Sequence, residues 1–75
     1  MFETIINSVN FKSFCQIECI TIDQMDYCIS FYCGKHNIQR IIYDVDGLLS
    51  AIDEIYELDG DMLGCNLFVE MIFNM

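Results

Sequence analysis

The chain has 75 residues, 55% of them hydrophobic and 20% charged, and its formal net charge is −9. This length predicts a single domain over residues 1–75, and the six Phe and four Tyr argue against an intrinsically disordered chain. The acidic balance disfavours direct contact with nucleic acid or with anionic membranes. No apolar run approaches the roughly 20 residues that span a bilayer, and no secretory signal is evident, so we expect a cytoplasmic protein.

The N-terminal region is predicted to form a short helix followed by a strand. Residues 2–9 place four apolar side chains at helical spacing. Residues 13–22 alternate, with Cys15, Ile17 and Cys19 on one face, which is typical of a strand.

Two more strands are predicted in the middle of the chain. Residues 26–33 alternate apolar and polar side chains, and residues 38–43 are rich in β-branched and aromatic residues. Residues 23–25 and 34–37 provide short turns between the strands. Three strands joined by short turns form an antiparallel meander.

A helix is predicted from residue 45, with Asp44 or Asp46 as its N-cap and Gly60 at its end. Its apolar stripe consists of Val45, Leu48, Leu49, Ile52, Ile55 and Tyr56. Residues 63–73 alternate as a strand does, although a helix is the alternative, and we favour the strand. The expected fold is therefore α+β: a small antiparallel sheet of three or four strands, one covering helix and a short N-terminal helix.

The charge is distributed unevenly along the chain. Residues 1–40 hold four acidic and three basic residues, a net of −1, whereas residues 41–75 hold eight acidic residues and no Lys or Arg, a net of −8. We expect nothing in the first part to neutralise the second. The helix and the residues after it should present a row of six carboxylates: Asp46, Asp53, Glu54, Glu57, Asp59 and Asp61. Such a row resembles the regularly spaced anions of a nucleic-acid strand, and a solvated face that keeps the protein soluble is the alternative.

Two patterns suggest a metal site, and neither is favoured. The spacings Cys15–x₃–Cys19 and Cys28–x₄–Cys33, with His36 nearby, loosely suggest zinc. However, Cys28 and Cys33 would point to opposite faces of one regular strand. We expect the cysteines to be reduced and to fill the core, because their number is odd and the compartment is cytoplasmic.

The second pattern resembles a calcium-binding EF-hand loop. Asp59, Asp61, Gly64 and Glu70 match its positions one, three, six and twelve, but Leu63 lies where a liganding side chain is expected. A helix stop followed by a turn explains these residues better. We therefore expect no metal and no cofactor.

Catalytic motifs are not found in the sequence. No glycine-rich phosphate loop, nucleophile elbow or HExxH motif is present, and His36 is the single histidine. A Cys33–His36 pair is the alternative, but we expect no catalytic residues and no enzyme.

A small, acidic, proline-free α+β chain without a catalytic motif resembles phage-encoded inhibitors of host defence, in particular small acidic anti-CRISPR proteins and other DNA-mimic inhibitors. The expected layout, a short N-terminal helix, a three-stranded meander and an acidic C-terminal part, is similar to anti-CRISPR proteins that block the DNA-binding cleft of effector nucleases. Some members end in helices, whereas residues 63–73 are predicted here as a strand. The resemblance covers layout and charge, and it transfers no residue roles.

We therefore expect a non-enzymatic inhibitor that docks its acidic row into the nucleic-acid-binding cleft of a larger basic protein, such as a CRISPR effector. Long-range attraction would speed the encounter, and Tyr56 and Tyr32 are the expected aromatic anchors. The alternative is a structural or regulatory interaction module, a homodimer or small adaptor subunit, that uses an exposed apolar face of the sheet.

Overall fold

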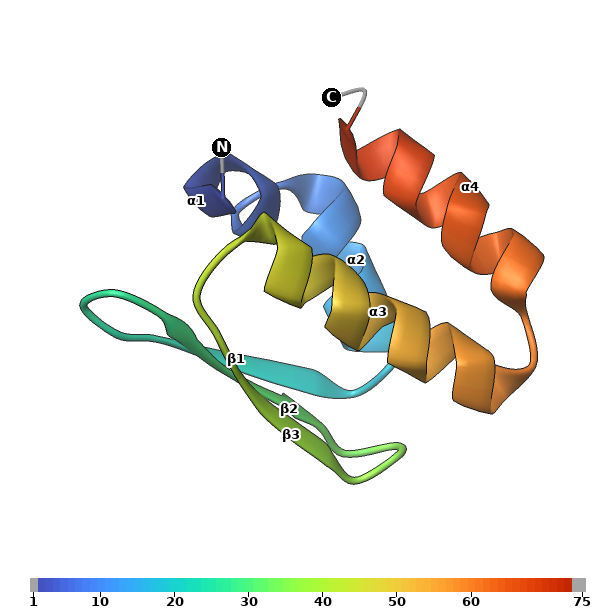
Figure 1. Ribbon diagram of the computed structural model, residues 1–75, viewed down its shortest axis with the longest axis horizontal. Coiled ribbons are helices and arrows are strands. Elements are labelled where there is room, and N and C mark those ends of the chain that lie inside the picture. The colour runs from blue at the N-terminus through green and yellow to red at the C-terminus, as the bar shows by residue number, and fades with distance from the viewer. Residues whose placement is uncertain (1, 74–75) are drawn as a thin grey trace.

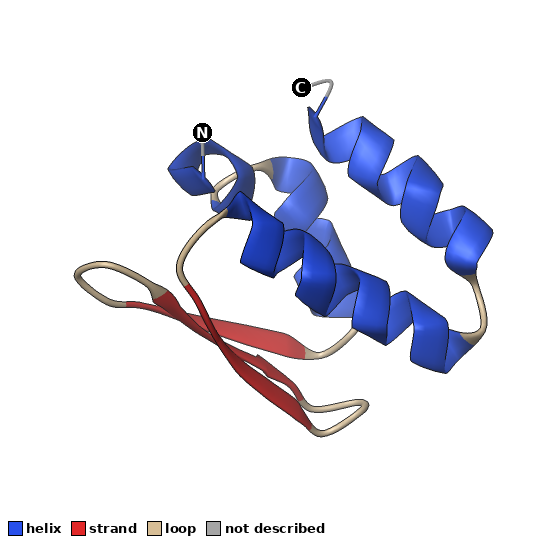
Figure 2. Cartoon of the chain, in the orientation of Figure 1, coloured by secondary structure: helices blue, strands red, loops and turns tan. Residues whose placement is uncertain are grey.

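The protein consists of a small sheet with all its helices on one side (Figures 1 and 2). The structure is a computed structural model that describes residues 2–73. Its three strands are β1 (Ile20–Gln24), β2 (Ile29–Cys33) and β3 (Ile38–Ile42), in the order β1-β2-β3 with antiparallel neighbours. The α+β class and the antiparallel meander are confirmed.

The register of the sheet fixes which side chains enter the core. Ile29, Phe31 and Cys33 of β2 are buried beneath the helices. Tyr32, between them, points to the opposite face, because successive side chains alternate along a strand. The turn predicted at residues 34–37 is confirmed, and Asn37 adopts the left-handed conformation with φ of 56°. The preceding turn lies later than predicted, because Met25 N donates to Cys28 O at 2.9 Å.

The short N-terminal helix is confirmed, although it ends earlier than predicted, whereas the strand predicted at residues 13–22 was wrong over most of its length. Two helices, α1 (Phe2–Ile6) and α2 (Val9–Ile17), occupy most of the region predicted as one helix and one strand. Ser8 separates them: its hydroxyl donates to Ile5 O at 2.7 Å and accepts from Phe11 N at 3.1 Å, which caps α2. Ile17, which the predicted strand would bury, is 71% exposed.

Helix α3 (Val45–Asp59) follows the sequence prediction closely. Asp44 is its N-cap and accepts from Gly47 N at 2.8 Å. Gly60 ends the helix with φ of 75°, a left-handed conformation that glycine adopts without steric cost. The buried side of α3 consists of Leu48, Ala51, Ile52 and Ile55.

The strand favoured at residues 63–73 was wrong, because this segment is helix α4 (Met62–Phe73). Most residues of this segment are apolar, so its sequence is compatible both with the alternation of a strand and with the spacing of a helix. Packing decides between them: Cys65 and Phe68, three residues apart, are both buried. The carboxylate of Asp61 accepts from Gly64 N at 2.9 Å and so caps the first turn.

The helices form two layers over the sheet. Helix α2 packs against β1 and α3 against β3, so two helices cover the sheet where the sequence predicted one. Helix α4 packs against α2 and α3 and lies farthest from the sheet (Figure 1). The rings of Phe14, Tyr56 and Phe68 join the three helices, with centroids 4.6–6.3 Å apart. None of the described helices is long and apolar enough to cross a membrane.

Candidate functional site

Three carboxylates line the solvent side of α3, and we refer to Asp46, Asp53 and Glu57 as the outer row. All three are exposed, and they recur after seven and then four residues, which places them on one face of the helix. At 1.5 Å per residue, the row extends for about 16 Å. Among residues 2–73, no Lys, Arg or His lies within ion-pair distance of these carboxylates.

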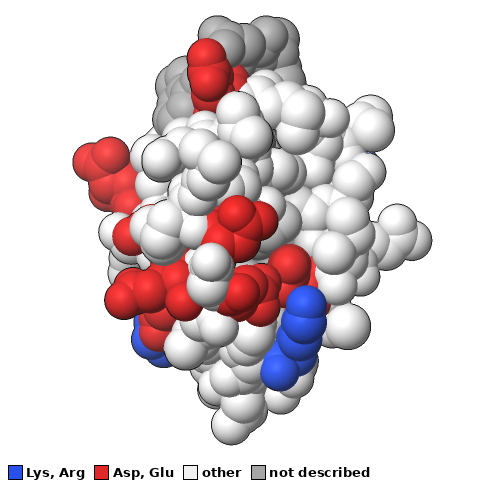
Figure 3. All heavy atoms as spheres, turned by 90° about the vertical axis from the view of Figure 1, so that its right-hand side faces the viewer, with Lys and Arg blue, Asp and Glu red and all other residues white. Residues whose placement is uncertain are grey.

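Several acidic side chains gather on the face of the molecule that Figure 3 shows. Not all of them are free, however. Glu54 accepts from Arg40 Nη2 of β3 at 2.6 Å, and Asp59 Oδ1 lies 2.7 Å from Nε2 of His36 in the β2–β3 turn. The expectation that nothing in the first part of the chain neutralises the second was therefore wrong. Arg40 of β3 and His36 of the β2–β3 turn thus lie against the side of α3 that faces the sheet.

Asp61 has a structural role instead of a place in the row. Its carboxylate caps α4, and its position follows Gly60, where the chain leaves α3. The six predicted carboxylates thus divide equally. Asp46, Asp53 and Glu57 stay in the outer row without a cationic partner in the described chain, although the Cys65 thiol contacts Asp53. Glu54, Asp59 and Asp61 instead pair with Arg40, with His36 and with the backbone of Gly64, respectively.

The two tyrosines predicted as anchors lie in different places. The ring of Tyr56 packs 5.7 Å from Phe14, centroid to centroid, and burial raises the pKa of its hydroxyl, with Glu18 adding to the shift. Tyr32 is 40% exposed on the outer face of the sheet, where its hydroxyl donates to Asn37 Oδ1 at 3.3 Å. Tyr32 and the outer row therefore belong to different elements, β2 and α3.

The exposed apolar surface belongs to α4 more than to the sheet. Leu63, Leu67 and Met71 are 72%, 61% and 48% exposed, and their spacing of four residues aligns them along the helix. We refer to these three residues as the α4 stripe. The outer face of the sheet mixes polar residues with Tyr32 and Ile41. An apolar contact with a partner therefore fits α4 better than the predicted sheet face.

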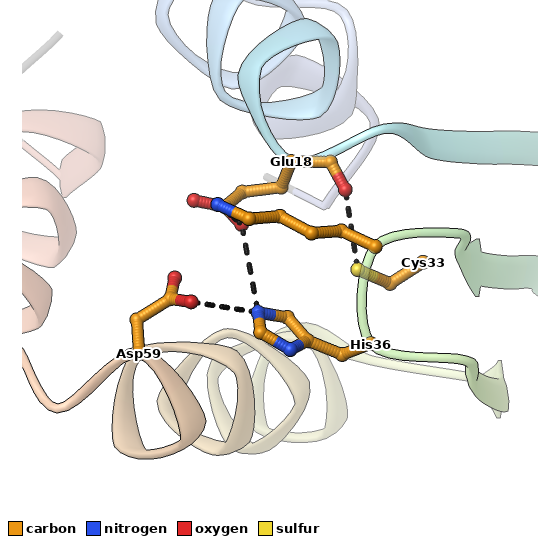
Figure 4. A network of polar contacts seen from close by, with 5 residues as sticks. Glu18, Cys33, His36 and Asp59 are labelled. Atoms are coloured by element: carbon orange, nitrogen blue, oxygen red, sulfur yellow. Dashed lines mark hydrogen bonds and ion pairs between the residues drawn. The ribbon is translucent and has the colours of Figure 1, made fainter.

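A second group of functional side chains lies beneath the end of α3, and we refer to Glu18, His36 and Asp59 as the inner cluster (Figure 4). They come from the end of α2, the β2–β3 turn and the last residue of α3. His36 Nε2 lies 2.7 Å from Asp59 Oδ1 and 3.9 Å from Glu18 Oε2. Sequence reasoning missed this cluster because its members are separated by 18 and 23 residues and only the fold brings them together.

The cysteines do not form the zinc set that their spacing suggested. The Cys33 thiol donates to Glu18 O at 3.2 Å and the Cys28 thiol contacts Met25 Sδ at 3.6 Å. Burial raises the pKa of the Cys15 thiol to about 12. Burial also raises the pKa of Cys65, whose thiol donates to Asp53 Oδ1 at 3.7 Å. Cys33 and Cys65 are buried, as predicted for cysteines that fill the core, whereas Cys19 is exposed.

Residues 2–73 show neither a contact between Cys33 and His36 nor a set of carboxylates arranged as in an EF-hand loop. Cys33 and His36 contact Glu18 O and Asp59, respectively, instead of each other. In the loop that resembled an EF-hand, Asp59 faces His36, Asp61 caps α4 and Glu70 is exposed within α4. These carboxylates do not converge on one point.

The chain matches no protein-family model, no curated protein and no solved structure in the comparisons made.

Proposed function

We propose that the protein is a non-enzymatic inhibitor that docks the outer row into a basic, nucleic-acid-binding cleft of a larger protein and occludes that cleft. The observation that supports this most is the outer row itself: three exposed carboxylates on one helix face, without a cationic partner in the described chain. A partner that binds phosphates with Lys and Arg offers the complementary surface.

The spacing of the row suits a cleft that grips a nucleic-acid backbone. Asp46 and Asp53 are about 10 Å apart along the helix axis, and Asp53 and Glu57 about 6 Å apart. Phosphates follow one strand of DNA every 3.4 Å or so along its axis. The row therefore imitates roughly every second or third phosphate, and cations that bind a phosphate backbone can contact it without a change of spacing.

The net charge and the α4 stripe have separate roles in this proposal. The field of a chain with net charge −9 accelerates the encounter with a basic surface, and salt weakens that effect. The duration of the complex depends on apolar contacts that exclude water. Leu63, Leu67 and Met71 can supply these contacts, because α4 packs beside α3. The resemblance to anti-CRISPR proteins suggests a CRISPR effector nuclease as the kind of partner.

A second candidate follows from the α4 stripe alone. Three exposed apolar residues in one line are typical of a helix that pairs with another surface, so a homodimer or adaptor subunit is the alternative. A dimer through α4 would dissociate when Leu67 is replaced by Asp, and its affinity would depend weakly on salt. Sedimentation of wild type and Leu67→Asp over a range of concentrations separates this candidate from the first.

Affinity capture with matched charge variants tests the inhibitor function. Asp53→Lys with Glu57→Lys reverses two charges of the outer row. Asp23→Lys with Asp26→Lys reverses two exposed charges in β1 and in the β1–β2 turn, outside α3. We expect nuclease-treated host lysate to yield a basic nucleic-acid-binding protein with wild type and with the β1 variant, and none with the outer-row variant.

Circular dichroism establishes that both variants are folded before capture. Rising sodium chloride should release the captured protein from wild type. If the outer-row variant retains the same proteins as wild type, the outer row is not the binding face.

A further inference from the structure

We propose that the inner cluster of Glu18, His36 and Asp59 is a binding site for a divalent transition-metal ion, with zinc as the best fit. The inference does not depend on the inhibitor function. It also differs from the two metal patterns in the sequence, since it uses none of the cysteines and one residue from each of three separate elements. One imidazole nitrogen and two carboxylate oxygens are a donor set that zinc accepts.

The distances in the cluster fit one ion after small side-chain rotations. The three ligand atoms lie within 4.8 Å of one another. Bonds of about 2.0–2.2 Å in tetrahedral geometry would place ligand atoms roughly 3.3–3.6 Å apart. The Nε2–Oδ1 distance between His36 and Asp59 would widen from 2.7 Å, and the Nε2–Oε2 distance between His36 and Glu18 would shorten from 3.9 Å. Each of these two changes is under about 1 Å, and the oxygens of Glu18 and Asp59, within 4.8 Å of each other, would approach by at most about 1.5 Å.

Glu18 provides the observation that points to a ligand. Its side chain is only 8% exposed, and its Oε2 is a buried oxygen without a hydrogen-bond partner in the described chain. Lys35 Nζ, 3.5 Å away, offsets part of the charge of this oxygen but makes no hydrogen bond to it. A buried carboxylate oxygen without a hydrogen bond is costly, and a metal ion at the cluster would satisfy it. The backbone of Glu18 is held on both sides, because its N–H donates to Phe14 O and its C=O accepts from the Cys33 thiol (Figure 4). The carboxylate is thus positioned toward His36.

The helix termini around the cluster also favour a cation. Glu18 follows the last residue of α2, and Asp59 is the last residue of α3, so two helices direct their C-terminal ends toward the same place. Helix C-termini carry partial negative charge and attract cations. Neither helix has a basic residue in its last turn to offset this charge.

Lys35 is the group that competes with the ion. Its Nζ lies 3.5 Å from Glu18 Oε2 and its side chain is 47% exposed, so the ammonium can turn into solvent when a metal arrives. Three protein ligands leave the fourth position of a tetrahedral ion open to water. The site is therefore suited to an exchangeable ion that joins α2, the β2–β3 turn and α3.

Zinc titration of chelator-treated protein tests the proposal, with thermal unfolding and NMR as readouts. We expect zinc chloride to raise the melting temperature of wild type and to shift the ring signals of His36, which is the single histidine. His36→Gln and Asp59→Asn should each weaken zinc binding by about 100-fold or more, because each removes a ligand. Lys35→Met should tighten it several-fold.

Glu57→Gln is the matched control, because it removes one negative charge from α3 two residues away from Asp59. It should leave zinc affinity nearly unchanged. The five thiols could also bind metal, and cobalt chloride distinguishes them from the inner cluster. Cobalt bound to thiolates absorbs light in a charge-transfer band, and we expect no such band for cobalt bound at the inner cluster.

The proposal is overturned if zinc leaves the His36 ring signals of wild type unmoved, which requires no variant to fold. It is also overturned if His36→Gln binds zinc as wild type does, or if cobalt binding produces the thiolate band.

Discussion

Helix α3 carries carboxylates on two faces, and the two faces differ in what surrounds them. On the solvent side, Asp46, Asp53 and Glu57 have no cationic partner in the described chain. On the side toward the sheet, Glu54 contacts Arg40 and Asp59 contacts His36. The comparison shows that a count of charges predicts the field of the molecule, whereas only the fold decides which carboxylates are available to a partner.

The largest expected effect lies at the inner end of α3. His36→Ala should lower the free energy of unfolding by about 1.5–3 kcal/mol, the range for a hydrogen bond to a charged group. The side chains of His36 and Asp59 are only 18% and 22% exposed, and the substitution leaves the carboxylates of Asp59 and Glu18 facing each other. Urea unfolding measures the change. A loss smaller than about 0.5 kcal/mol would show that the inner cluster contributes little to stability.

A smaller effect is expected for the pair between Arg40 and Glu54. Their side chains are 48% and 38% exposed, so the interaction should be worth less than about 1 kcal/mol. A double-mutant cycle with Arg40→Ala and Glu54→Ala isolates this energy, and it should shrink further in 0.5 M salt. If the coupling energy between Arg40 and Glu54 were as large as the effect of His36→Ala, the exposure of a pair would not determine its contribution to stability.

The two ends of the outer row should respond with opposite signs. Asp46 lies in the first turn of α3, where the helix dipole favours a negative charge, and Glu57 lies near the C-terminal end, where the dipole disfavours it. Asp46→Asn should therefore destabilise the protein by about 0.3–1 kcal/mol, and Glu57→Gln should stabilise it by a similar amount. Thermal unfolding at low salt measures both. If both substitutions destabilise, Glu57 has an attractive partner and the row is not free.

The smallest effect concerns the contact between Asp53 and the Cys65 thiol. Burial, and then the charge of Asp53, raises the pKa of this thiol, so little thiolate forms at neutral pH. In Asp53→Asn, the charge is lost while the burial stays, so the pKa should fall part of the way toward its ordinary value. The labelling rate of Cys65 should then begin to rise at a lower pH than in wild type. An unchanged pH profile would mean that Asp53 points away from the thiol into solvent.

The sequence predicts the parts of this fold that have strong local signals. Asp44 before an apolar stripe and Gly60 after it set the limits of α3. The turn at residues 34–37 separates one strand whose side chains alternate from another that is rich in β-branched residues. The same reasoning fails where the apolar residues of one segment fit both the two-residue period of a strand and the 3.6-residue period of a helix. Residues 13–22 and 63–73 are rich in apolar side chains, so alternation is found whether or not a strand is present. The missed signals are the caps, Ser8 for α2 and Asp61 for α4.

The candidate site divides in the same way. The outer row is predictable, because Asp46, Asp53 and Glu57 share one face of a helix that the sequence defines. The pairing of Glu54 and Asp59 is not predictable, since it depends on how the sheet packs against α3. The inner cluster depends on three elements that meet only in the folded chain. Glu18 lies in a segment predicted as a strand, whereas in the structure it is the C-cap of helix α2.

Competition with DNA tests the central claim, which is that the outer row takes the place of a phosphate backbone. The partner obtained by affinity capture is loaded with fluorescent DNA, and anisotropy follows the release of that DNA as the protein is added. We predict that wild type and Asp23→Lys/Asp26→Lys displace the DNA, that rising salt weakens the displacement, and that Asp53→Lys/Glu57→Lys does not displace it. If wild type binds the partner without releasing DNA, or if the outer-row variant displaces DNA as well as wild type does, the claim is contradicted.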